Sequence, residues 1–233
     1  MTDRLGGAVD RRPLHFIWIL DISGSMAGGG RIQALNTAIE ETLPQLREDS
    51  LDHPQAQLFV RALTFADQPA WLHQAPVPVE QFRWDRINAV PQGLTELGAA
   101  IIQLVPVMQE LGRSGRGFAP VLVLVSDGRP THANGPTLDQ AMAALQAEPW
   151  GAASVRMAVG IGEDADLAAL ARFIDHPDRQ PLRASNQTDL VTMIQWASRQ
   201  ASRAAANPAS PDVPLATTTQ PMPSGPVWDA STG

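Results

Sequence analysis

The fold is decided by one short stretch, Phe16-Ile-Trp-Ile-Leu20 followed directly by Asp21-Ile-Ser23-Gly-Ser25. Consecutive apolar residues of this kind are typical of a β-strand that is buried on both faces of a sheet. A carboxylate and two hydroxyls follow where that strand ends. Such oxygen donors suit a hard cation like Mg²⁺, which prefers an octahedral oxygen shell and few protein carboxylates. The stretch therefore predicts a central strand with a candidate cation site at its carboxyl end.

Two later segments of the chain supply oxygen donors of the same kind. Thr95 lies in Gly93-Leu-Thr95-Glu-Leu-Gly98, and Asp127 comes just after the apolar run Val121-Leu-Val-Leu-Val125. In open α/β sheets, ligands bind outside the carboxyl ends of the strands. Because Asp21 and Asp127 follow two different strands, we expect them to meet at one edge of the sheet.

These residues resemble the metal-ion-dependent adhesion site of von Willebrand factor A (VWA) domains, and the resemblance covers roughly residues 13–203. The family signature is DxSxS, then a Thr in a Gly-flanked loop, then an Asp after a hydrophobic strand. The matching positions are Asp21, Ser23, Ser25, Thr95 and Asp127. The resemblance implies a bound Mg²⁺, Mn²⁺ or Ca²⁺ that keeps some water ligands. A carboxylate of a partner protein, from Asp or Glu, would replace one of those waters.

The sequence around the site looks most like the bacterial TerY-type VWA proteins of tellurium-resistance and stress gene clusters. The similar segments are Leu20-Asp-Ile-Ser-Gly-Ser-Met26, Leu35-Asn36 and Ser126-Asp-Gly-Arg-Pro-Thr131. This resemblance implies a scaffold or regulator with protein partners, namely a PP2C-like phosphatase and a Ser/Thr kinase. The pathway implied is bacterial stress, tellurium-resistance or phage-defence signalling.

Strand-like and helix-like segments alternate along the chain, which predicts an α/β fold. We expect a doubly wound, mostly parallel central sheet with helices on both faces, as in Rossmann-like folds. The expected strands are 14–20, 57–65, 70–74, 121–125 and 154–161, and the expected helices are 31–47, 96–111, 138–147, 167–174 and 188–204. Pro44 and Pro106 lie inside two of these helices, and an interior proline is expected to kink a helix or end it early.

Composition divides the chain into three parts. Residues 1–12 are polar and are expected to be flexible, residues 13–204 form the VWA-like domain, and residues 205–233 read as a disordered Pro/Ser/Thr-rich tail. Near the end of that tail stands Trp228. It is either an incidental aromatic residue or the centre of a short peptide that docks on a partner.

Charge and residue usage exclude several functions. The net charge is −7 and no basic patch is present, so nucleic-acid binding is not expected. Cysteine and lysine are both absent, which removes thiolate chemistry, Schiff bases and the P-loop lysine. The N-terminus lacks the apolar core of a signal peptide and no run reaches the length of a membrane helix. We therefore expect a cytoplasmic protein without a membrane anchor.

Three alternatives to a non-enzymatic adhesion module stay open. Ser23 and Ser25 would simply cap a helix and Asp127 would hold a turn if no metal is bound. A metal-dependent phosphohydrolase would need a nucleophile or base beside the metal. An aspartyl-phosphate enzyme would carry its second Asp at the position of Ser23. A partner subunit of an AAA+ ATPase would use the same metal chemistry with a different partner.

Overall fold

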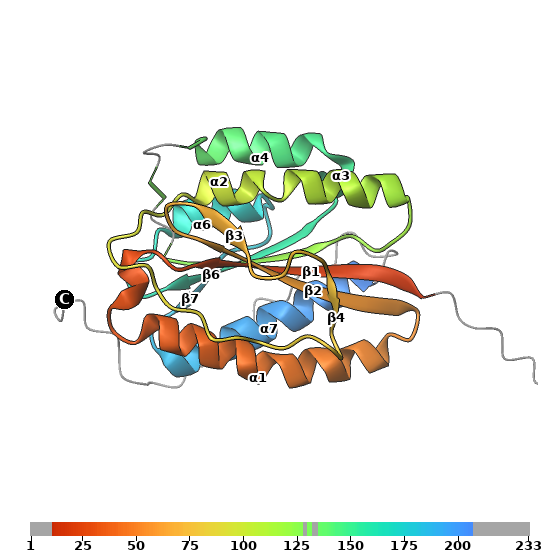
Figure 1. Ribbon diagram of the computed structural model, residues 1–233, viewed down its shortest axis with the longest axis horizontal. Coiled ribbons are helices and arrows are strands. Elements are labelled where there is room, and N and C mark those ends of the chain that lie inside the picture. The colour runs from red at the N-terminus through yellow and green to blue at the C-terminus, as the bar shows by residue number, and fades with distance from the viewer. Residues whose placement is uncertain (1–10, 128–129, 132–134, 207–233) are drawn as a thin grey trace, which may run out of the picture.

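The computed structural model describes residues 11–127, 130–131 and 135–206, and it has a sheet between two layers of helices (Figure 1). Within the described residues the sheet has seven strands, and its order is β3-β2-β1-β5-β6-β7, with β4 also paired to β2. The strands are β1 (Arg12–Asp21), β2 (Ala56–Phe65), β3 (Pro69–Trp71), β4 (Val77–Pro78), β5 (Val121–Ser126), β6 (Val155–Ile161) and β7 (Leu182–Ala184). Pairing is parallel from β2 through β1, β5 and β6 to β7, whereas β3 and β4 run antiparallel to β2. The predicted doubly wound, mostly parallel sheet is confirmed.

Helices cover both faces of this sheet. On one face lie α1 (Arg31–Asp52) and α7 (Gln187–Ala206), which pack against each other, and a short 3₁₀ helix, η1 (Gly24–Ala27), precedes α1. The opposite layer contains α2 (Leu97–Ile102), α3 (Val105–Ser114), α4 (Leu138–Ala147), α5 (Pro149–Ala152) and α6 (Leu167–Ile174). None of the described helices combines the length and the apolar character that crossing a bilayer requires.

The apolar run of β1 is the centre of two cores. Phe16, Trp18 and Leu20 face the layer of α1 and α7, while Ile17 and Ile19 face the other layer. All five side chains are at most 1% exposed. A strand between two parallel neighbours and two helical layers has no solvent face, which explains why its sequence is apolar throughout rather than alternating.

The two helix prolines have different outcomes. Helix α1 does not end early at Pro44 but continues to Asp52, because Leu43 and Leu46 on either side of the proline are buried in the core. Tertiary burial therefore offsets the lost backbone hydrogen bond. The predicted helix 96–111 is wrong as one element: it is broken into α2 and α3. Pro106 lies in the first turn of α3, where a missing N–H costs nothing.

A buried amide fixes the segment that leads to the site. Asn36 on α1 is 3% exposed, and its Nδ2 donates to the carbonyl oxygen of Ile87 at 2.9 Å. Its Oδ1 accepts from the backbone N–H of Ile87 and from Nε1 of Trp84. A few residues later, the N–H of Val90 donates to the carbonyl oxygen of Ile22, which lies inside the DxSxS segment. The amide thus holds the segment between β4 and α2 against α1.

The outermost elements of the described residues are β1 and α7. Strand β1 already begins at Arg12, and α7 continues to Ala206. Residues 1–10 and the tail from residue 207, including Trp228, lie outside the described residues. The flexible character of both segments and the docking role of Trp228 stay predictions.

Candidate metal centre

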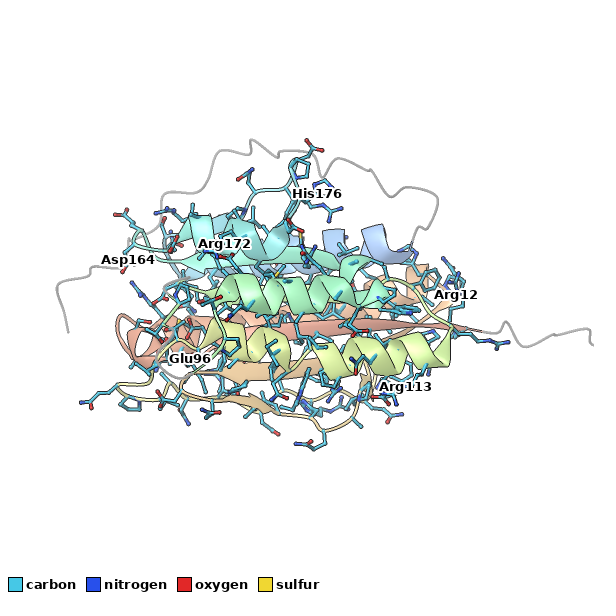
Figure 2. All side chains as sticks on the ribbon, turned by 90° about the horizontal axis from the view of Figure 1, so that it is seen from above. Arg12, Glu96, Arg113, Asp164, Arg172 and His176 are labelled. Atoms are coloured by element: carbon cyan, nitrogen blue, oxygen red, sulfur yellow. The ribbon has the colours of Figure 1, made fainter. Side chains whose placement is uncertain are left out.

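The predicted site residues gather at the carboxyl end of the parallel strands. Asp21 is the last residue of β1, and Asp127 comes directly after β5, the neighbouring strand. Figure 2 shows this end of the molecule through the labels of Glu96 and Asp164, with Arg12 at the opposite end. The parallel pairing of β1 and β5 therefore brings together two carboxylates that are far apart in the sequence, as expected for this class of sheet.

Asp21 is fixed by hydrogen bonds on both of its carboxylate oxygens. The backbone N–H of Ser23 donates to Oδ1 at 2.8 Å, and the hydroxyl of Ser126 donates to Oδ2 at 2.5 Å. The Ser23 and Ser25 hydroxyls lie 3.1 Å apart, so the two neutral donors of the DxSxS segment converge. Ser23 is buried, whereas Ser25 is exposed. The segment thus has a buried side, formed by Asp21 and Ser23, and an exposed side, formed by Ser25.

The two carboxylates place negative charge where water is excluded. Asp21 is 0% exposed and Asp127 is 1% exposed. The pKa of Asp21 is raised to about 6, first because burial disfavours its charged form and second because Asp127 carries the same charge. Hydrogen bonds from Ser126 and Ser23 act in the opposite direction. A cation bound between these groups would relieve the repulsion that raises this pKa.

Thr95 reaches the same end of the sheet through its loop. The N–H of Gly24 donates to the carbonyl oxygen of Gly93 at 3.0 Å, which joins the DxSxS segment to the loop of Thr95. On its other side, the Thr95 backbone exchanges two hydrogen bonds with Thr131: its N–H donates to the Thr131 hydroxyl, and its carbonyl accepts from the Thr131 N–H. Thr95 is 6% exposed. Its loop is therefore clamped between the segments that follow β1 and β5.

Sequence reasoning missed a cation beside these carboxylates. Arg31, the first residue of α1, lies with Nη1 3.9 Å from Oδ2 of Asp127 and with Nη2 3.1 Å from Oδ1 of Asp164. It also missed the hydroxyls of Ser126 and Thr131, which hold Asp21 and Thr95. Ser126 carried a usable signal, because it directly precedes Asp127 at the end of a strand. Nothing in the local sequence points from Arg31 to Asp127.

The donor set fits a hard divalent cation. The described residues contain no group of three or more His, Cys, Asp or Glu side chains that could hold a metal. The expected set is of a different kind, since it has two carboxylates and three hydroxyls. Mg²⁺ uses one or two carboxylates and keeps several waters, so a set of this size is suitable without a full protein cage.

Comparisons of this chain with known proteins give matches among solved structures only. The sequence matches no protein-family model and no curated protein. Among solved structures, a von Willebrand factor type A protein from Catenulispora acidiphila is similar with a TM-score of 0.60 and 13% identity, over 82% of this chain and 43% of that one. The ArnB paralog VWA2 from Sulfolobus acidocaldarius is similar with a TM-score of 0.55 and 16% identity, over 78% of this chain and 44% of that one.

A pilus adhesin, SpaC from Lactobacillus rhamnosus GG, is similar with a TM-score of 0.62 and 12% identity, over 83% of this chain and 31% of that one. In each case the match spans less than half of the other chain. At such low identity the likeness shows the fold alone. The fold of this chain is that of VWA domains, and the expected fold is thereby confirmed.

Proposed function

We propose that this chain is a non-enzymatic interaction module that binds an acidic side chain of a partner protein through a divalent cation. The cation is Mg²⁺, or Mn²⁺ or Ca²⁺ in its place, and its ligands are Asp21, Ser23, Ser25, Thr95 and Asp127. The observation that carries the proposal is the pair of buried carboxylates, Asp21 and Asp127, next to the converging hydroxyls of Ser23 and Ser25. Such a set attracts a hard cation and leaves it partly hydrated.

The open coordination position explains why a carboxylate is the proposed ligand. Ser25 is exposed, so the side of the set that it forms faces solvent. With only two carboxylates among its ligands, the bound cation keeps affinity for a further anion. An Asp or Glu of a partner replaces one metal-bound water and supplies that anion. The five proposed ligands are carboxylates and hydroxyls, with no histidine among them to act as a general base, which favours binding over hydrolysis.

The partner class follows from sequence resemblance. The segment from Leu20 to Met26 and the segment from Ser126 to Thr131 look like those of TerY-type proteins. On that ground we propose a PP2C-like phosphatase or a Ser/Thr kinase of a bacterial stress, tellurium-resistance or phage-defence system as the partner. An AAA+ ATPase is the other partner class that this metal chemistry would serve.

An affinity capture from native lysate tests the proposal. The baits are the wild-type chain, Ser25→Ala/Asp127→Ala, and Ser114→Ala, which removes a hydroxyl from the far end of α3 as a matched control. We expect a partner that is captured in Mg²⁺, lost with chelator and lost with the double variant, but kept by Ser114→Ala. The identity of the captured protein distinguishes the phosphatase or kinase from the ATPase.

Two results would contradict this function. Capture that survives both the chelator and the double variant would show that the metal is not part of the interface. Turnover of a generic phosphoester that disappears in Asp21→Ala would show a hydrolase instead. A further bait that ends at Ala206 assigns the contribution of residues 207–233 and Trp228.

A further inference from the structure

Arg31 lies in a position that helix stability does not explain. It is the first residue of α1, a helix of 22 residues, with Gly30 as its N-cap. The N-terminus of a helix carries a partial positive charge, so a cation there is unfavourable. The side chain is also only 11% exposed, which adds the cost of removing a charge from water. Interactions beyond the helix must therefore hold Arg31 in place.

Two carboxylates and one glycine form the surroundings of this guanidinium. Nη2 donates to Oδ1 of Asp164 at 3.1 Å, and Nη1 lies 3.9 Å from Oδ2 of Asp127. The second distance is too long for a hydrogen bond, so the attraction to Asp127 is Coulombic. Gly162 has φ +88° and leaves the space that the pair needs, since a Cβ there would lie 2.8 Å from both Arg31 Nη2 and Asp164 Oδ1.

The same loop is tied to Asp127 through the backbone. The N–H of Asp166 donates to the carbonyl oxygen of Asp127 at 2.7 Å, and the Asp166 side chain caps α6. The loop between β6 and α6 therefore carries Asp164 and is anchored next to Asp127. This anchoring keeps Asp164 within hydrogen-bond distance of Arg31, so that both a cation and a second carboxylate contribute to the charge balance around the proposed ligand Asp127.

We propose that Arg31 is a tuning residue of the metal site: it places a positive charge close to Asp127 before a metal binds, and it weakens divalent-cation binding. Asp164 limits this effect because it neutralises part of the guanidinium charge. The inference rests on the proposed metal site. The proposal predicts that the two residues change metal affinity in opposite directions. Removing the charge of Arg31 tightens metal binding, and removing the charge of Asp164 weakens it.

The size of the effect follows from the distances. A charge within about 4–6 Å of a carboxylate changes its proton affinity by about 1–3 pKa units, and each unit is about tenfold. For the affinity of a divalent cation we take the lower end of this range, because such a cation is bound partly through water. We therefore expect Arg31→Gln to lower the Kd for Mg²⁺ by about tenfold and Asp164→Asn to raise it by a smaller factor, about threefold, because Asp164 is 37% exposed.

Isothermal titration with MgCl₂ at constant ionic strength tests these signs on the full chain. The variants are Arg31→Gln, Asp164→Asn and their combination. The control is Arg86→Gln, which breaks an exposed ion pair between Arg86 and Glu40. Glu40 lies on α1 more than two turns after Arg31. We expect opposite changes in Kd for the two single variants, partial cancellation in the double variant and no change in the control. Thermal melts without metal check that each variant folds. If Arg31→Gln does not fold, the Kd of Asp164→Asn, which is expected to rise, tests the proposal.

The outcomes separate this inference from the proposed function. Wild-type binding with unchanged or weaker binding in Arg31→Gln would overturn the role of Arg31 while the metal site stands. Binding by Arg31→Gln but not by the wild type would support the role of Arg31 and overturn the metal-dependent function. Binding by neither protein would overturn both.

Discussion

Gly98 is the position where one added methyl group tests the packing beside the site most sharply. It lies in α2, three residues after Thr95, and α2 packs against α4. A Cβ at residue 98 would be 2.0 Å from the carbonyl oxygen of Pro136 and 3.2 Å from the carbonyl carbon of Thr137. Ordinary C···O contacts begin near about 3.3 Å, so the two segments would have to separate by about 1 Å. Because the obstructing atoms are backbone, no side-chain rotation relieves the clash.

We expect Gly98→Ala to lower the free energy of unfolding by about 3 kcal/mol, the upper part of the usual range for overpacking. Gly112→Ala in α3 is the matched control, because its Cβ would come no closer than 3.4 Å to any neighbour, the nearest being Cδ1 of Trp150. Alanine is the better helix former, so this control should gain about 0.5 kcal/mol.

Urea unfolding, followed by tryptophan fluorescence and far-ultraviolet circular dichroism, measures both changes. The two variants make the same chemical change in two helices, and their stabilities should differ by about 3–4 kcal/mol. We also expect Gly98→Ala to bind Mg²⁺ more weakly, since the loop of Thr95 moves with α2. Equal stability of the two variants would refute the close approach of α2 to residues 136–137, and with it the position of Thr95.

Two further predictions concern pH and backbone strain. The pKa of His15 is lowered to about 4, mainly by burial and then by the charge of Arg61, so its neutral form is favoured in the folded state. Burial of neutral His15 therefore does not lower the free energy of unfolding above about pH 6.5, but lowers it by up to about 3 kcal/mol as the pH falls towards about 4. Urea unfolding of His15→Gln should lack this decrease. A variant with the same pH profile as the wild type would contradict the prediction. Gln92 has φ +62° in the turn where the N–H of Gly93 donates to the carbonyl of Val90. Gln92→Asn should raise the free energy of unfolding by about 0.5 kcal/mol, and Gln92→Val should lower it by about 1 kcal/mol. Urea unfolding measures both changes, and a valine variant more stable than the wild type would refute the strain.

The central strands and the place of the candidate ligands Asp21 and Asp127 could be predicted from the sequence for a clear physical reason. The runs that became β1 and β5 are apolar without interruption, and only a strand buried on both faces requires that pattern. Once both strands are parallel neighbours, Asp21 and Asp127 must emerge at the same edge. The topology therefore follows from the pattern of elements, and the place of the candidate ligands follows from the topology.

Other features depend on contacts that no local pattern encodes. Arg31 meets Asp164 only because Gly162 has a positive φ and the loop after β6 folds back, which is a tertiary property. Strand β7 has three residues, Leu182–Ala184, too few for any periodicity to appear. The sequence pattern predicts one helix with Pro106 in its interior, although proline is also favourable in the first turn of a new helix. Residues beyond the helix decide which reading applies.

The most direct test of the central claim is a crystal of the wild-type chain soaked in Mn²⁺ and measured for anomalous scattering of manganese. We expect an anomalous peak within about 2.2 Å of the hydroxyl oxygens of Ser23 and Ser25, with Asp21 and Asp127 in direct or water-mediated contact. A crystal in which this position has no peak would contradict the claim that the DxSxS segment, Thr95 and Asp127 form a metal site.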